Sequence, residues 1–116
     1  MARSDFNYIP FSHTFTDDEP QLTVEFPIEG NVDPIDDGYL LITAHNATNN
    51  AWQGNKIYIN NQELPGWDIA WHDPGWQTWM DHIPSWFLHS GTNSIMVVRV
   101  GDDDLTTKDI VVHWRE

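Results

Sequence analysis

The feature that most constrains the fold is a series of short apolar segments separated by turn-forming residues. In residues 11–16 and 22–26 apolar and polar side chains alternate, and residues 39–45 (YLLITAH) form an almost continuous apolar run of strand length. Alternation with a period of two is typical of a half-buried β-strand, because successive side chains point to opposite faces. Turn signals recur at the spacing typical of sandwiches, and no segment keeps a sustained helical period. The sequence therefore predicts an all-β fold of two packed antiparallel sheets.

Further segments extend this pattern toward the C-terminus. Strands are expected at residues 57–60, 94–100 and 106–114. Residues 76–82 form the least clear strand, because their apolar residues do not fall consistently on alternate positions. Residues 1–10 show no pattern and predict a loose arm or a first edge.

Between the later strands one short helical element is expected. Residues 85–89 are long enough for a single helical turn, with Ser85 as its cap and Gly91 as its stop. Gly91 is expected to take a positive φ angle at the entry to the following strand.

The length and composition indicate one globular domain. The chain has 116 residues, enough for one core, and we expect a single β-sandwich over residues 1–116. The absence of cysteine excludes disulfides, thiolate metal sites and cysteine nucleophiles. The N-terminus lacks the apolar region of a signal peptide, and no apolar run is long enough for a membrane helix. We therefore expect a soluble protein, cytoplasmic or exported without a leader, and no membrane insertion.

The charge balance excludes two classes of partner. Eighteen acidic residues against five basic ones give a formal net charge of −13 at pH 7. Nonspecific nucleic-acid binding requires the opposite sign, because its affinity comes from neutralising phosphates. An anionic membrane surface would repel the chain for the same reason. Solubility, a salty habitat and cation binding remain as explanations of the charge, and solubility alone is favoured.

A dense group of aromatic residues lies in the second half of the chain. Five tryptophans fall within a stretch of twenty residues, namely Trp67, Trp71, Trp76, Trp79 and Trp86. They lie between a strand ending in an Asn-rich turn (residues 57–61, IYINN) and the later motifs Ile83-Pro84 and 88–95 (LHSGTNSI). In this order the motifs resemble those of the galactose-binding-domain-like jelly rolls, in which IxxNG-like, IPxxxL and LxxGxNxI runs recur. The resemblance implies a jelly-roll β-sandwich similar to carbohydrate-binding modules, and it implies sugar recognition only on average.

The expected strand directions sort the loops between the two ends of the sandwich. If every connection reverses direction, loops 17–21, 46–55 and 83–93 share one end, and loops 29–38, 61–75 and 101–105 share the other. The second end then collects aromatic residues and many aspartates, namely Asp33, Asp36, Asp37, Asp68, Asp73, Asp102, Asp103 and Asp104. Aromatic faces stack on the C–H faces of pyranose rings while carboxylates accept hydrogen bonds from hydroxyls, so this end is the expected sugar site.

The predicted sugar-binding residues centre on the sequence WHDPGW. They are Trp67, Trp71, His72, Asp73 and Trp76, in which a Pro-Gly turn can hold two indoles toward a common space. The carboxylates of Asp36, Asp37 and Asp103 complete the rim or, as hard oxygen donors, hold calcium. The competing structural explanation is that tryptophans fill the core and acidic turns are merely solvated. Trp79 and Trp114 are the tryptophans expected in the core.

Three functional hypotheses follow from these residues. The leading one is a non-catalytic, lectin-like module that binds a glycan or another small polar ligand, without a certain cofactor. The second is an assembly module that forms a homo-oligomer or part of a larger particle through its Trp-rich surface. An enzyme is the least favoured, because no HExxH pair, GxSxG motif, phosphate-binding loop or dinucleotide fingerprint is present.

Overall fold

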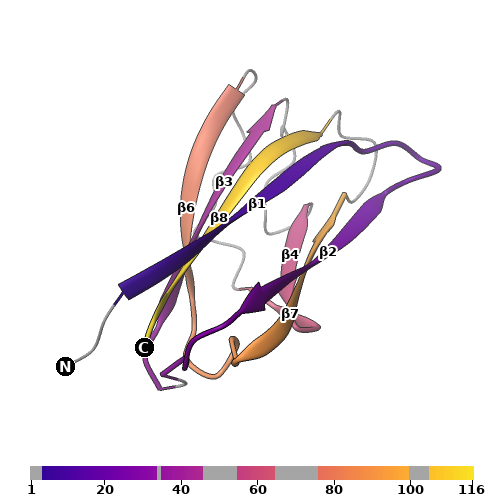
Figure 1. Cartoon of the computed structure of the whole chain (residues 1–116). Coiled ribbons are helices and arrows are strands. Elements are labelled where there is room, and N and C mark those ends of the chain that lie inside the picture. Colours follow the sequence, from indigo (N-terminus) through magenta and orange to yellow (C-terminus); the bar gives the residue numbers. More distant parts are fainter. Residues whose placement is uncertain (1–3, 34, 46–54, 65–75, 100–104) are drawn as a thin grey trace.

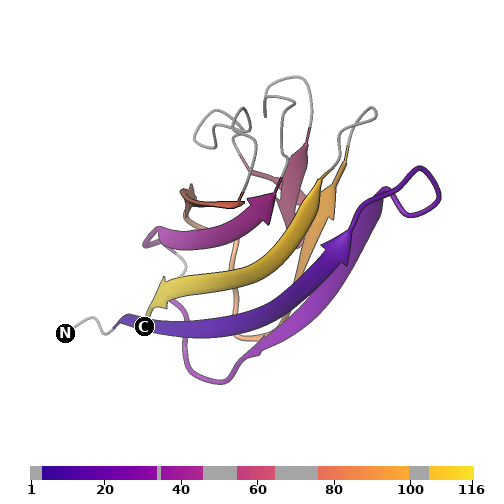
Figure 2. The ribbon, with the colours of Figure 1, turned by 90° about the horizontal axis from the view of Figure 1, so that it is seen from above.

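The computed structural model describes residues 4–33, 35–45, 55–64, 76–99 and 105–116, and within them the chain forms two antiparallel four-stranded sheets packed as layers (Figures 1 and 2). The strands are β1 (Ser4–Thr14), β2 (Gln21–Ile28), β3 (Gly38–His45), β4 (Lys56–Ile59), β5 (Gln62–Glu63), β6 (Trp76–Ile83), β7 (Gly91–Val98) and β8 (Thr106–Arg115). The first sheet has the order β1-β8-β3-β6 and the second has the order β2-β7-β4-β5. This arrangement confirms the predicted all-β, jelly-roll sandwich.

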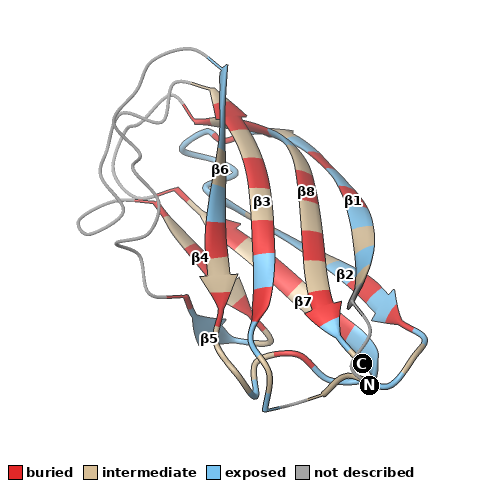
Figure 3. Cartoon of the chain, turned by 90° about the vertical axis from the view of Figure 1, so that its left-hand side faces the viewer, coloured by how far each residue is buried: buried red, intermediate tan, exposed pale blue. Residues whose placement is uncertain are grey.

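The core lies between the two sheets, where the long strands bury alternate side chains. In β3 the inward residues are Leu40, Ile42 and Ala44, all fully buried, and in β7 they include Ile95 and Val97. The resulting buried bands alternate with intermediate or exposed ones along β3 and β8 in Figure 3. No helix that is long and apolar enough to cross a membrane occurs in the described part of the chain.

The N-terminal segment forms a full strand at the edge of the first sheet, so of the two predicted alternatives the first edge is confirmed and the loose arm is wrong for residues 4–10. Strand β1 pairs with β8 from Ser4 opposite Arg115 to Thr14 opposite Thr106. Its inward residues include Ile9, which is buried, whereas Phe6 and Tyr8 on the other face are exposed. The apolar residues thus change face within the strand, from Phe6 and Tyr8 on the outward face to Ile9 on the inward face, so the sequence shows no continuous apolar face.

The connection from β6 to β7 contains a turn at residues 85–86 in place of the expected helical turn. Gly91 has a φ angle of +94°, which confirms the predicted left-handed conformation. The side chain of Asn93 closes this connection, since its Oδ1 accepts from the His89 N–H at 3.1 Å and its Nδ2 donates to the His89 carbonyl at 2.7 Å. These bonds replace the ones that a helix would have made.

A tight hairpin between β4 and β5 reverses the direction of every later strand relative to the direction that the sequence predicted. Asn60 and Asn61 form its turn with φ angles of 50° and 66°, a conformation that asparagine tolerates better than most residues. The two-residue strand β5 therefore adds one reversal that the sequence-based sorting of loops did not include.

This extra reversal makes part of the predicted loop sorting wrong. At one end of the first sheet, here called the His45 end, His45 is opposite both Trp76 and Thr106, so the strands that follow residues 65–75 and 101–104 begin there. At the other end, the Gly38 end, Gly38 is opposite Ile83, so the connection to β7 lies beside residues 29–37. Loop 83–93 thus shares an end with loop 29–38, contrary to expectation.

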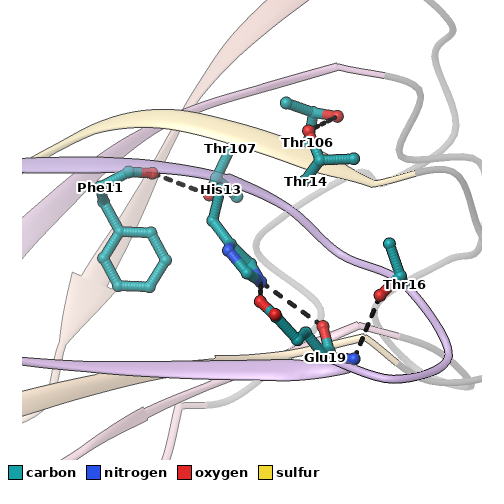
Figure 4. A network of polar contacts seen from close by, with 7 residues as sticks. All are labelled: Phe11, His13, Thr14, Thr16, Glu19, Thr106 and Thr107. Atoms are coloured by element: carbon teal, nitrogen blue, oxygen red, sulfur yellow. Dashed lines mark hydrogen bonds and ion pairs between the residues drawn. The ribbon is translucent and has the colours of Figure 1, made fainter.

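The turn at residues 15–20 joins β1 to β2 at the His45 end, where the predicted sorting had placed it. The Glu19 N–H donates to Thr16 Oγ1 at 3.1 Å, and Nε2 of His13 lies 3.4 Å from the Glu19 carbonyl oxygen. Figure 4 shows the His13 ring reaching from β1 toward Glu19 across this turn. The ring also packs edge-on against Phe15, with 4.5 Å between centroids, so the turn is fixed to β1 by both polar and aromatic contacts.

Candidate functional site

The outer face of the first sheet gathers most of the exposed apolar side chains of the described residues. We use the name outer face for the following side chains of this sheet, which are among those that point away from the second sheet: Phe6, Tyr8, Tyr39, Leu41, Thr43, His45, Trp76, Thr78, Met80, His82, Lys108, Asp109, Val111, His113 and Arg115. Among the described residues seven large hydrophobic ones are exposed, and five of these belong to the outer face, namely Phe6, Tyr8, Tyr39, Trp76 and Met80. An apolar surface of this kind, interleaved with polar groups, is typical of a binding surface.

Trp76 anchors the outer face at the His45 end. It begins β6 opposite His45, and the indole and imidazole rings are tilted by 30° with 4.9 Å between centroids. The Lys108 ammonium lies 5.7 Å from the centre of the indole, within the range of a cation–π contact. The tryptophan is nevertheless 53% exposed, so these contacts fix the ring and leave much of it open to a ligand.

A groove of about 250 Å³ occupies the Gly38 end of the same face. Residues of β3, β6 and β8 line it, including Tyr39, Leu41, Met80, His113 and Arg115. Gly38 is required at its base, because a Cβ atom there would lie 2.5 Å from the His113 carbonyl oxygen. Tyr39 and Met80 give the groove apolar lining, and Arg115 supplies a charged group.

Asp37 also lines this groove and is held by two neighbours. Its Oδ1 accepts a hydrogen bond from the Ser85 N–H at 2.9 Å, and its Oδ2 lies 3.5 Å from Nε2 of His82. A carboxylate with one oxygen committed to a backbone amide keeps a defined orientation. Asp37 can thus present its remaining lone pairs to a hydroxyl group in the groove.

Polar pairs separate the two ends of the outer face. The hydroxyls of Thr43 and Thr78 lie 2.9 Å apart across β3 and β6. On the neighbouring strands the Tyr8 hydroxyl donates to Oδ1 of Asp109 at 2.5 Å. This hydrogen bond raises the pKa of Tyr8, because it favours the protonated phenol.

The structure separates Trp76 from Asp36 and Asp37, which the sequence placed at one end of the sandwich. Trp76 lies at the His45 end, whereas Asp36 and Asp37 lie beside β3 at the Gly38 end. The other predicted sugar-binding residues, Trp67, Trp71, His72 and Asp73, lie outside the described residues. The expectation that Trp76 and Asp37 share an end is wrong because of the reversal that β5 adds.

Of the predicted calcium ligands, Asp36 and Asp37 lie beside β3 at the Gly38 end, and Asp103 lies outside the described residues. Within the described ranges no three His, Asp or Glu side chains are close enough together to hold a metal ion.

The remaining tryptophans follow the sequence-based assignments in part. Trp114 is buried and Trp79 packs partly buried against the core, as predicted. Trp86 is 67% exposed at the Gly38 end, with a positive φ angle of 72°. Sequence reasoning missed the groove at the Gly38 end.

The two-sheet architecture is that of jelly-roll carbohydrate-binding modules. A family 35 carbohydrate-binding module from Clostridium thermocellum matches with a TM-score of 0.53 at 13% identity, over 97% of both chains. A family 35 module from an environmental isolate matches with a TM-score of 0.54 at 21% identity, over 79% of this chain and 64% of that one. Dimeric latent PorU from Porphyromonas gingivalis matches with a TM-score of 0.64 at 11% identity, over 99% of this chain and 13% of PorU.

These likenesses confirm the predicted fold, and the chain spans less than two thirds of both PorU and the environmental module. By sequence the chain belongs to DUF7383, a family of unknown function that matches residues 3–116. No curated protein matches the chain.

Proposed function

We propose that this chain is a non-catalytic carbohydrate-binding module that holds a sugar ring against Trp76. The observation that carries the proposal is an indole that is 53% exposed and yet fixed by the His45 ring and the Lys108 ammonium. The apolar C–H face of a pyranose stacks on an indole, and neighbouring polar groups bond its hydroxyls. Because His45 and Lys108 already hold the ring, little side-chain entropy is lost when the sugar binds.

Two further considerations support a sugar ligand. The fold is shared with proteins described as family 35 carbohydrate-binding modules. Trp67, Trp71, His72 and Asp73 remain part of the proposed site, because they precede Trp76 directly in the sequence. Calcium held by Asp36, Asp37 or Asp103 remains a separate proposal, which a chelator tests independently.

A homo-oligomer is the second candidate, and one observation favours it. Five large apolar side chains exposed on one face are also typical of an interface between protein chains. The loss of Trp76 distinguishes the two candidates, because it should weaken glycan binding in a carbohydrate-binding module and self-association in a homo-oligomer.

The experiment is a glycan array followed by titration calorimetry with each glycan that binds, in calcium and in chelator. We expect Trp76→Ala to weaken binding by about tenfold or more, equal to about 1.4 kcal/mol, and to leave the protein folded. Trp86→Ala is the matched control, because Trp86 is the same residue type with similar exposure at the opposite end. The affinity of Trp86→Ala for each glycan should equal that of the wild type.

Two results would contradict the proposal. The absence of any glycan that binds, with or without calcium, would remove the sugar ligand. A concentration-dependent sedimentation coefficient that Trp76→Ala abolishes would favour the homo-oligomer instead.

A further inference from the structure

Trp76 and the groove at the Gly38 end lie on the same face of the first sheet, with the Thr43 and Thr78 hydroxyl pair between them. Strands β3 and β6 pair over their whole length, with His45 opposite Trp76 at one end and Tyr39 opposite His82 at the other. Leu41 lies opposite Met80, toward the Gly38 end. The strand pair therefore carries apolar side chains at both ends, with Trp76 at one end and Leu41 and Met80 toward the other. Because alternate residues share a face, all of these positions are on the same surface.

We infer that this surface binds an internal stretch of a linear glycan chain, running from Trp76 at the His45 end to Tyr39 and Met80 at the Gly38 end. The inference rests on the proposed function and specifies its substrate class. It assigns the groove at the Gly38 end as a second contact region for the same chain.

The length of the surface requires an extended ligand. From Tyr39 to His45 the strand advances six residues, which is about 20 Å at the rise of an antiparallel strand. A single sugar ring stacked on Trp76 cannot reach the groove over that distance. Several linked rings can lie along β3 and β6 and contact both ends.

Apolar and hydrogen-bonding groups alternate along this surface, as the C–H faces and hydroxyls of the sugar rings do along a glycan chain. Trp76, Met80 and Tyr39 present apolar surface to the C–H faces of sugar rings. Between them the Thr43 and Thr78 hydroxyls can both donate and accept, and at the far end Asp37 accepts while Arg115 donates. Grooves with apolar floors and a few fixed polar groups at their edges are typical of sites for small polar ligands.

The charge of the chain disfavours a second copy as the occupant of this surface. Each copy carries a formal net charge of −13, so two copies repel one another as they approach. A glycan without acidic groups brings no such repulsion. The same surface can therefore admit a neutral chain while the protein remains monomeric.

The test measures affinity against chain length, with cello-, xylo-, manno- and galacto-oligosaccharides from disaccharide to hexasaccharide as the probes. For the wild type we expect affinity to rise with length by about tenfold or more, until the chain reaches the groove. Tyr39→Ala should remove this gain and leave the affinity for the shortest bound ligand unchanged. Trp76→Ala should weaken binding at every length. Trp86→Ala is the matched control, which should change neither the affinity for the shortest ligand nor the gain in affinity with length.

The outcomes separate this inference from the proposed function. Equal affinity for short and long oligosaccharides, or a length gain that survives in Tyr39→Ala, overturns the inference and leaves a sugar site confined to Trp76. If array glycans bind but none of the four oligosaccharide series does, the inference is likewise overturned and the proposed function stands. If no glycan of any kind binds, both fail. Self-association that Tyr39→Ala abolishes would show that the surface is an interface between copies.

Discussion

At the scale of single residues, the outer face places a phenol beside a carboxylate. The Tyr8 hydroxyl donates to Asp109 across β1 and β8, and this bond raises the pKa of Tyr8 from its ordinary value of 10.0. Protonated Tyr8 is thus favoured in the folded protein. The stability contributed by this bond is fully present below the ordinary pKa, and it is lost as the pH rises through the higher folded-state pKa.

An ultraviolet absorbance titration of the tyrosines tests this pair. Subtracting the curve of Tyr8→Phe from that of the wild type should give a phenol that ionises above pH 10, because Asp109 stabilises its protonated form. In Asp109→Ala the same subtraction should give an ordinary tyrosine, whereas Asp36→Ala is the control and should not alter it. Circular dichroism over the same range checks that the protein stays folded. A Tyr8 pKa at its ordinary value in the wild type would contradict the hydrogen bond.

At the scale of elements, the entry into β7 depends on one left-handed residue. Gly91 has a φ angle of +94°, and a Cβ atom there would meet nothing within 4 Å. Any cost of a side chain at this position therefore comes from backbone strain, because there is no clash. We expect Gly91→Val to lower the free energy of unfolding by about 1–3 kcal/mol.

Denaturant unfolding measures this loss, and Thr92→Val is its matched control. Thr92 is the next residue of β7, it is exposed, and valine has nearly the shape of threonine. Its effect should stay within about 0.5 kcal/mol, the range of ordinary surface substitutions. If Gly91→Val also falls within that range, the strained entry has no energetic role.

The elements also show which parts of the fold were predictable from sequence. Strand β2 was predictable because its outward residues are polar, so alternation reveals its buried face. The N-terminal half of β1 was not, since Phe6 and Tyr8 occupy its outward positions. The end of the sandwich at which each later loop lies was predicted wrongly, because β5 has only two residues, too few for a sequence pattern to reveal a strand.

The same reasoning applies to the candidate site. The sequence singled out Trp76 because Gly and Pro precede it closely, and the indole is indeed exposed. It gave no indication of the groove at Tyr39, because the apolar run of residues 39–45 is what a strand buried on both faces would also show. Only the register of β3 with β6 and β8 places Tyr39, Met80 and His113 around one groove.

At the scale of the whole molecule, negative charge is spread widely and few cations offset it. Of the described basic residues, Lys56 pairs with Glu63 at 2.8 Å and Arg99 pairs with Asp17. The other two, Lys108 and Arg115, lie on the outer face. The outer face is thus relatively poor in net negative charge, whereas carboxylates elsewhere repel one another. This repulsion lowers the stability of the compact state, and salt screens it.

Thermal unfolding at low and high sodium chloride tests this repulsion. We expect the midpoint to rise by about 5 °C between 0.05 M and 1 M salt, which corresponds to about 1 kcal/mol for a domain of this size. The physical reason is that the screening length falls from more than 10 Å to about 3 Å over this range. The comparison variant is Glu25→Lys with Glu29→Lys, which exchanges two exposed acids for bases and makes the net charge less negative. This variant should be more stable at low salt and should gain less from added salt. An equal gain in both proteins would mean that salt acts through burial of apolar surface and that repulsion between the carboxylates contributes little.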